Sequence, residues 1–145
     1  IDYKNVEPMG FYPLGLEGLT FLAMQRLFGY QDEKFQELGA KNAKFSLIIR
    51  LFMKYFFSVD KVADLVPKMW RKYYTTGELR VEEYSQNKRY AILRLRNFEL
   101  HPLLCQNLLG YFSSVLQMVV GFQVRAEEKK CTHKGDDYHE FLMEW

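Results

Sequence analysis

The feature that most constrains the fold of this chain is a change in hydrophobic periodicity at Gly77. After this point apolar and polar residues alternate with period two, which is typical of half-buried strands. Four stretches show the alternation, and turn-forming residues join them in two pairs: 79–84 with 89–96, and 122–130 with 138–145. Two such hairpins can join into one four-stranded antiparallel sheet with helices covering one face. We therefore predict an α+β fold.

About four helices are predicted around this sheet, because apolar residues recur at helical spacing in four segments. These segments cover residues 14–28, 31–56, 58–74 and 102–121. Ser58 suits an N-cap and Pro102 the first position of a helix, whereas Pro67 should kink or split the third helix. The first helix is apolar on more than one side, so we expect either burial within the domain or a contact between two subunits.

Composition is that of a single globular domain. The 145 residues include 12 Phe and 10 Tyr, enough for a packed core, so residues 1–145 are expected to form one domain. Acids and bases are interspersed at a net charge of +2, without the basic stripe of a nucleic-acid surface. No apolar run reaches the ~18 residues of a membrane span. Two reduced thiols in a cytoplasmic protein are expected rather than a disulfide.

Four residues in the second half of the chain have the chemistry of zinc ligands: Cys105, Glu128, Cys131 and His139. Two thiolates, a carboxylate and an imidazole would close a tetrahedral site. His139 falls on the mostly apolar face of the last strand, and Cys105 lies in the first turn of its helix, where the dipole favours thiolate. Glu128 and Cys131 would point to opposite faces of a regular strand, so that strand must end or bulge near residues 129–131. The alternative is a buried core thiol and imidazole with a solvated carboxylate.

The same region resembles a known family. Its C-terminal signature runs Gly-x-Phe, Glu-x2-Cys, Gly-Asp and Cys-x-Phe, and this chain has Gly110-Tyr111-Phe112, Glu128, Cys131, Gly135-Asp136, His139 and Phe141. The resemblance is to the 4-vinyl reductase domain family, and it implies the ligand-binding fold of NO-signalling and Golgi-transport proteins. In aromatic-sensing members a Cys, Glu, Cys, Cys set binds structural zinc. This implies the same role for Cys105, Glu128 and Cys131, with His139 in place of the last Cys.

The resemblance also implies an apolar ligand pocket between the helices and the sheet. Candidate lining residues are Phe52, Phe56, Trp70, Tyr73 and Tyr74. An apolar cavity with a few hydroxyl or indole donors suits a small aromatic or acyl ligand, although the same residues could serve as plain core. We predict a non-catalytic small-molecule-binding or sensor domain that contains structural zinc and forms a homodimer.

Two other functions stay open at this point. An enzyme or accessory protein of tetrapyrrole or aromatic metabolism would fit the family's name, with His101 and Cys105 as a thiol–imidazole pair. The sequence contains no GxGxxG, P-loop or HExxH motif that would support such chemistry. A dimeric adaptor, like the trafficking relatives, would use the helix at 14–28 as its interface. A closed four-ligand zinc site has no open position for a substrate, which favours the non-catalytic function.

Overall fold

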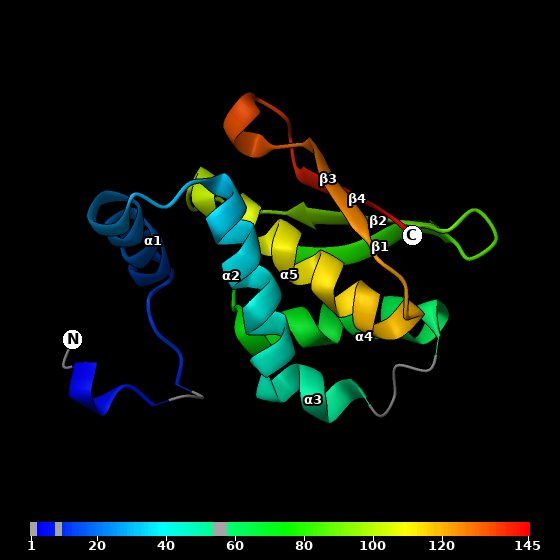
Figure 1. Cartoon of the computed structure of the whole chain (residues 1–145), viewed down its shortest axis with the longest axis horizontal. Coiled ribbons are helices and arrows are strands. Elements are labelled where there is room, and N and C mark those ends of the chain that lie inside the picture. The colour runs from blue at the N-terminus through cyan, green and yellow to red at the C-terminus, as the bar shows by residue number, and fades with distance from the viewer. Residues whose placement is uncertain (1–2, 8–9, 54–57) are drawn as a thin grey trace.

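The computed structural model describes residues 3–7, 10–53 and 58–145 of the chain (Figure 1). Within these residues, the elements in chain order are η1 (Tyr3–Asn5), α1 (Leu14–Phe28), α2 (Asp32–Phe45), α3 (Leu47–Met53), α4 (Val59–Tyr73), β1 (Glu78–Ser85), β2 (Tyr90–Arg96), α5 (Pro102–Val120), β3 (Arg125–Lys130), η2 (Thr132–Lys134) and β4 (His139–Glu144). The predicted α+β class is confirmed.

The four strands form one antiparallel sheet, as the alternating stretches predict, and their order in it is β1-β2-β4-β3. The two hairpins meet where β2 pairs with β4. Three facing pairs along this seam are buried: Ala91 with Met143, Leu93 with Phe141, and Leu95 with His139. Because alternate side chains share one face, the seam supplies a continuous apolar surface for the helices and also carries His139 into the interior.

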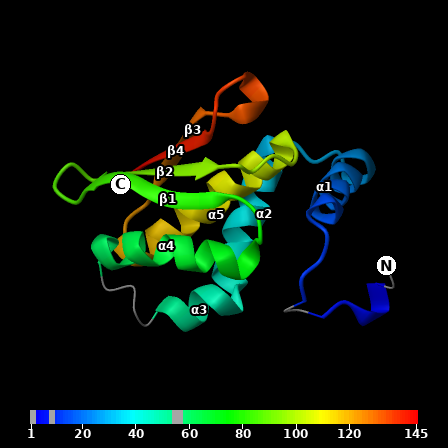
Figure 2. The same ribbon diagram turned by 180° about the vertical axis from the view of Figure 1, so that it is seen from behind.

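Helix α5 lies on this surface, and α2 packs across α5 (Figure 1). Two glycines permit a backbone-to-backbone crossing of these helices. A Cβ atom on Gly39 would fall 1.9 Å from the Asn107 carbonyl oxygen, and one on Gly110 would fall 1.9 Å from the Gln36 carbonyl oxygen. Figure 2 shows α4 running beside β1, with α3 at the end of the molecule away from the β3–β4 connection.

Helix α5 is the most buried helix in the described part of the chain. By length and composition alone, this helix could also cross a membrane. The search for an uninterrupted apolar run of ~18 residues did not detect it, because polar residues interrupt its apolar sequence. In this structure 61% of the apolar stretch of α5 is buried inside the domain. This packing is that of a core helix.

The periodic segment at 31–56 is two helices rather than one. Ser46 separates α2 from α3 with an extended backbone at φ −61° and ψ 123°. Its hydroxyl accepts the Ile49 N–H at 3.2 Å, so it acts as a cap for the second helix. Pro67, by contrast, does not split α4, which is continuous from Val59 to Tyr73. Ser58 caps that helix as predicted, with its hydroxyl accepting the Lys61 N–H.

A bulge in β1 changes the predicted face of its last residues. The register with β2 shifts between Val81 and Glu83, so the alternation after Val81 is out of step with that before it. Tyr84, not Glu83, therefore faces buried Ala91 across the strands, and its hydroxyl reaches Asp60 on α4 at 2.5 Å.

Helix α1 packs on the body of the domain along one side only. Phe21 is buried and its ring lies 5.4 Å from that of Phe35, measured between centroids. On the other sides, Leu19, Leu27 and Phe28 are 65%, 75% and 66% exposed. The helix is thus partly buried within the domain and also presents an apolar surface.

Candidate metal centre and cavity

The start of α5 fixes the position of Cys105. Pro102 occupies the beginning of the helix, and His101 caps it by accepting the Leu103 N–H on Nδ1 at 3.2 Å. His101 is used as a cap, and the imidazole that contacts the Cys105 sulfur belongs to His139, at 3.7 Å. The thiol–imidazole pair considered from the sequence is His101 with Cys105, whereas the structure pairs Cys105 with His139.

The end of β3 has the irregularity that the site requires. Its pairing with β4 shifts between Glu128 and Lys130, and the strand ends there. Cys131 then opens a tight turn: its carbonyl accepts the N–H groups of Lys134 at 2.9 Å and Asp136 at 3.3 Å. The Asp136 carboxylate in turn accepts the Cys131 N–H at 2.8 Å. As a result, Glu128 and Cys131 turn to the same side of the chain.

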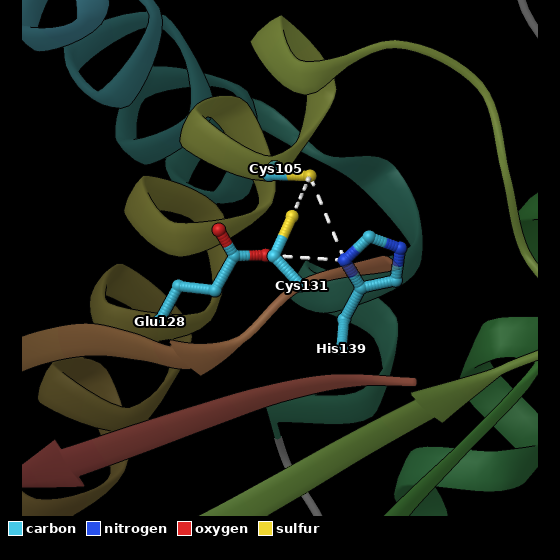
Figure 3. A group of neighbouring side chains, drawn as sticks. All are labelled: Cys105, Glu128, Cys131 and His139. Atoms are coloured by element: carbon cyan, nitrogen blue, oxygen red, sulfur yellow. Dashed lines mark hydrogen bonds and ion pairs between the residues drawn. The ribbon is translucent and has the colours of Figure 1, made fainter. Parts of the chain in front are cut away.

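The four predicted ligands come together at this point, with one donor atom from each residue within 4.8 Å of the others (Figure 3). Figure 3 shows Cys105 reaching down from α5 toward Cys131, while Glu128 and His139 approach from β3 and β4. The Cys105 sulfur lies 3.9 Å from the Cys131 sulfur and 3.7 Å from His139 Nδ1, which in turn lies 3.1 Å from Glu128 Oε1.

These distances fit a tetrahedral zinc site. Zinc bonds of ~2.3 Å to sulfur and ~2.0–2.1 Å to nitrogen or oxygen imply edges of about 3.8, 3.6 and 3.4 Å for sulfur–sulfur, sulfur–nitrogen and nitrogen–oxygen pairs. The three separations above agree with these edges within about 0.3 Å. The donor set, two sulfurs with one nitrogen and one oxygen, is also one that zinc accepts.

Hydrogen bonds on the far side of His139 orient its ring. Nε2 lies 3.1 Å from the Phe98 carbonyl oxygen, which can only accept, and 2.9 Å from Thr132 Oγ1. Nε2 therefore carries a proton, and in a neutral imidazole Nδ1 then presents a lone pair to Glu128. A lone pair that faces a carboxylate is repelled by it unless a metal ion or a proton lies between the two groups. Either a metal bound by all four residues or a protonated His139 paired with Glu128 meets this need.

The sulfur atoms lie in surroundings that disfavour a bare thiolate. Burial raises the pKa of the Cys105 thiol, and the nearby charge of Glu128 raises it further. The pKa of Cys131 is raised as well, mainly by burial, although the backbone N–H of His133 donates to its sulfur and opposes the shift. The position of Cys105 in the first turn of α5 therefore does not give it a lowered pKa, because burial and the charge of Glu128 act in the opposite direction. A bound divalent cation would lower the pKa of both thiols and so favour their thiolate forms.

A cavity of about 620 Å³ lies further along α5, and none of the four cluster residues lines it. Its walls come from α2, α4, β1, β2 and α5, and most lining side chains are apolar or aromatic. Three of the predicted residues, Trp70, Tyr73 and Tyr74, line it. Phe56 and the side chain of Phe52 lie outside the described part of the chain. Helix α5 connects the two sites, since Leu108 lines the cavity one turn after Cys105.

Sequence reasoning missed several polar residues of the cavity, among them Ser46, Tyr111 and Glu17. Tyr111 donates to the Tyr73 hydroxyl at 2.8 Å, and Tyr73 shares a hydrogen bond with Ser46. At another part of the wall Tyr74 donates to the Glu17 carboxylate at 3.2 Å. One available signal was that Tyr111 stands within the Gly-x-Phe motif, one residue from the helix-crossing glycine.

Fold and site together define an α+β domain in which four potential metal ligands join a core helix to the closing hairpin of the sheet. No protein-family model matches the sequence, and no curated protein matches it. Solved structures do. A vinyl-4-reductase family protein from Methanocaldococcus jannaschii is 16% identical, with a TM-score of 0.56 over 97% of this chain and 84% of that chain.

Two further structures extend the comparison. Trafficking protein particle complex subunit 3 from Naegleria fowleri, covalently bound to palmitic acid, is 18% identical, with a TM-score of 0.61 over 90% of this chain and 93% of that chain. The phenol-responsive sensory domain of the transcription activator PoxR, with phenol, is 11% identical, with a TM-score of 0.62 over 94% and 76%. This chain shares their fold, as its resemblance to the 4-vinyl reductase domain family implies.

Proposed function

We propose that this chain is a small-molecule-binding domain of the sensor type, with a hydrophobic or aromatic ligand held between α2, α4, α5 and the sheet. The observation that carries this proposal is the cavity. Its volume of about 620 Å³ falls within the ~300–1,000 Å³ of ligand pockets, and a few hydroxyl groups interrupt an apolar wall.

Two proteins with the same fold support the proposal through the ligands in their structures. The PoxR sensory domain is described with phenol, and the trafficking subunit is covalently bound to palmitic acid. The first ligand is aromatic and the second is an acyl chain. These are the two chemical classes that the lining of this cavity suits.

We also propose a structural zinc ion held by Cys105, Glu128, Cys131 and His139. With four protein ligands the site is closed, so zinc would have no open position for a substrate or a reactive water. Its contribution would be stability, because the free energy of binding a structural metal is also free energy of folding. The ion would join the start of α5 to β3 and β4, and so hold one wall of the cavity in place.

A homodimer through α1 completes the proposal. The exposed apolar residues of this helix, Leu19, Leu27 and Phe28, suit a contact with a second copy of the chain. The same surface supports a dimeric adaptor as the second candidate function. In an adaptor, α1 would form the dimer interface and the cavity would bind no ligand. A cytoplasmic location, where thiols stay reduced, fits both functions.

Binding of the neutral fluorescent probe aminoanthracene tests the ligand proposal. Ala63 lines the cavity on α4, so Ala63→Phe should fill part of it and reduce binding by at least about tenfold. The matched control is Lys68→Phe, which adds the same ring at an exposed position of the same helix. Probe binding by the wild type that neither substitution affects would contradict a ligand site here. A dimer in native mass spectrometry, with no probe binding, would favour the adaptor.

A further inference from the structure

One carboxyl group lines the cavity, and it belongs to Glu17 on α1. Among the described lining residues Glu17 is the only acid, and the only base is Lys72, whose side chain is exposed. None of the ion pairs formed by the described residues includes Glu17. The otherwise apolar wall therefore carries one carboxylate without a cationic partner in the described part of the chain.

The polar groups beside Glu17 have already used their protons. The Tyr74 hydroxyl lies 3.3 and 3.2 Å from the two carboxylate oxygens of Glu17, to which it donates its single proton. The Trp70 ring is stacked on that of Tyr74, 4.4 Å away between centroids, and its indole N–H donates to the Thr76 carbonyl at 3.0 Å. A carboxylate has about four acceptor positions, which one hydroxyl proton cannot fill. Together these three side chains offer a ligand acceptors and negative charge.

The surroundings of Glu17 favour a cation at those acceptors. Burial raises the pKa of the Glu17 carboxyl, because its charged form loses hydration that the hydrogen bond from Tyr74 only partly replaces. A positively charged donor would supply the missing stabilisation, whereas a second anion would be repelled. Glu17 is half-buried, so an ammonium group beside it would keep part of its own hydration. The desolvation cost that weakens fully buried ion pairs is therefore reduced here.

We infer that the cavity takes a small amphipathic amine whose apolar body packs against α4, α5 and the sheet and whose ammonium group donates to the Glu17 carboxylate. This inference rests on the proposed ligand-binding function and names the chemical class of the ligand. The apolar body is the hydrophobic or aromatic part that the cavity wall suits. The ammonium group adds a bond that combines opposite charges with hydrogen bonding, at a position set by one side chain.

Displacement of aminoanthracene at pH 7 by n-decylamine, n-decanol and n-decanoate tests the inference. The three competitors share a ten-carbon chain and present a cation, a neutral hydroxyl group and an anion, because alkyl ammonium groups such as that of Lys stay protonated at this pH. We expect n-decylamine to displace the probe at about tenfold lower concentration than n-decanol, since its bond to Glu17 is charge-assisted on both sides. Decanoate should be the weakest competitor.

Glu17→Gln locates the ammonium group. The substitution removes the charge but keeps the size of the side chain and an oxygen that accepts from Tyr74, so n-decylamine should lose its advantage over n-decanol. The matched control is Glu33→Gln, which makes the same change in net charge at an exposed position of α2 outside the cavity. It should keep the wild-type order of competitors. Circular dichroism shows whether both variants are folded.

Two results would overturn the inference and leave the proposed ligand-binding function standing. One is equal or tighter binding of n-decanol than of n-decylamine to the wild type, which needs no variant to be observed. The other is a preference for n-decylamine that a folded Glu17→Gln retains, because the ammonium group would then lie elsewhere. If the wild type does not bind the probe, the proposed function fails together with this inference.

Discussion

Replacement of His139 shows whether a metal or an ion pair holds the four side chains together. The side chains of His139 and Glu128 are 3% and 7% exposed, so His139→Ala leaves a buried carboxylate without its partner. Breaking a buried pair costs about 3–5 kcal/mol. In a chain of 145 residues, each kcal/mol lowers the melting temperature by about 4 °C. We therefore expect a decrease of roughly 12–20 °C.

His139→Cys separates the two explanations. A thiolate can replace imidazole as a zinc ligand, but it cannot form a cationic pair with Glu128. If zinc is bound, His139→Cys should stay well above His139→Ala in melting temperature and fall to the same level after treatment with EDTA. The assay is thermal unfolding followed by circular dichroism, with His133→Ala as the control at an exposed histidine. Equal melting temperatures for the two His139 variants, and a wild type insensitive to EDTA, would refute the metal account.

Three further substitutions test the helix crossing, the buried Glu17 carboxyl and the support of Cys131. Gly110→Ala should destabilise the protein by about 1–3 kcal/mol in urea unfolding, because its Cβ would fall 1.9 Å from the Gln36 carbonyl oxygen. Burial raises the pKa of Glu17 above 4.5, so the folded state favours its protonated form; stability should fall as pH rises from 4.5, and less so in Glu17→Gln. Asp136→Ala removes the acceptor of the Cys131 N–H and should weaken zinc affinity about 10–100-fold in chelator competition.

Local signals predict much of this fold. The period-two alternation gives both hairpins, and Pro102 with Gly121 gives the ends of α5, because chain geometry and caps act over a few residues. Strand parity also shows that Glu128 and Cys131 can share one ion only if β3 is interrupted. The register shift before Lys130 confirms this. The metal cluster could thus be predicted from residue types, spacing and one geometric argument, together with the resemblance to the 4-vinyl reductase domain family.

Features that depend on contacts between distant elements could not be predicted. Ser46 interrupts a segment whose apolar spacing fits a helix on both sides, and its hydroxyl is hydrogen-bonded to Tyr73, which lies far away in the sequence. The pKa of Cys105 is a second case. Its place in the first turn of a helix predicts a lowered pKa, but burial under the hairpin and the charge of Glu128 act in the opposite direction.

The metal content of the protein, purified without added zinc, tests the central claim most directly. Inductively coupled plasma mass spectrometry should find about one zinc ion per chain, and a paired Cys105→Ser, Cys131→Ser variant should contain none. Removal of the zinc by a chelator should also lower the melting temperature of the wild type, because α5 and the β3–β4 hairpin would lose the ion that joins them. Zinc far below one per chain, with a melting temperature that chelation leaves unchanged, would contradict the account.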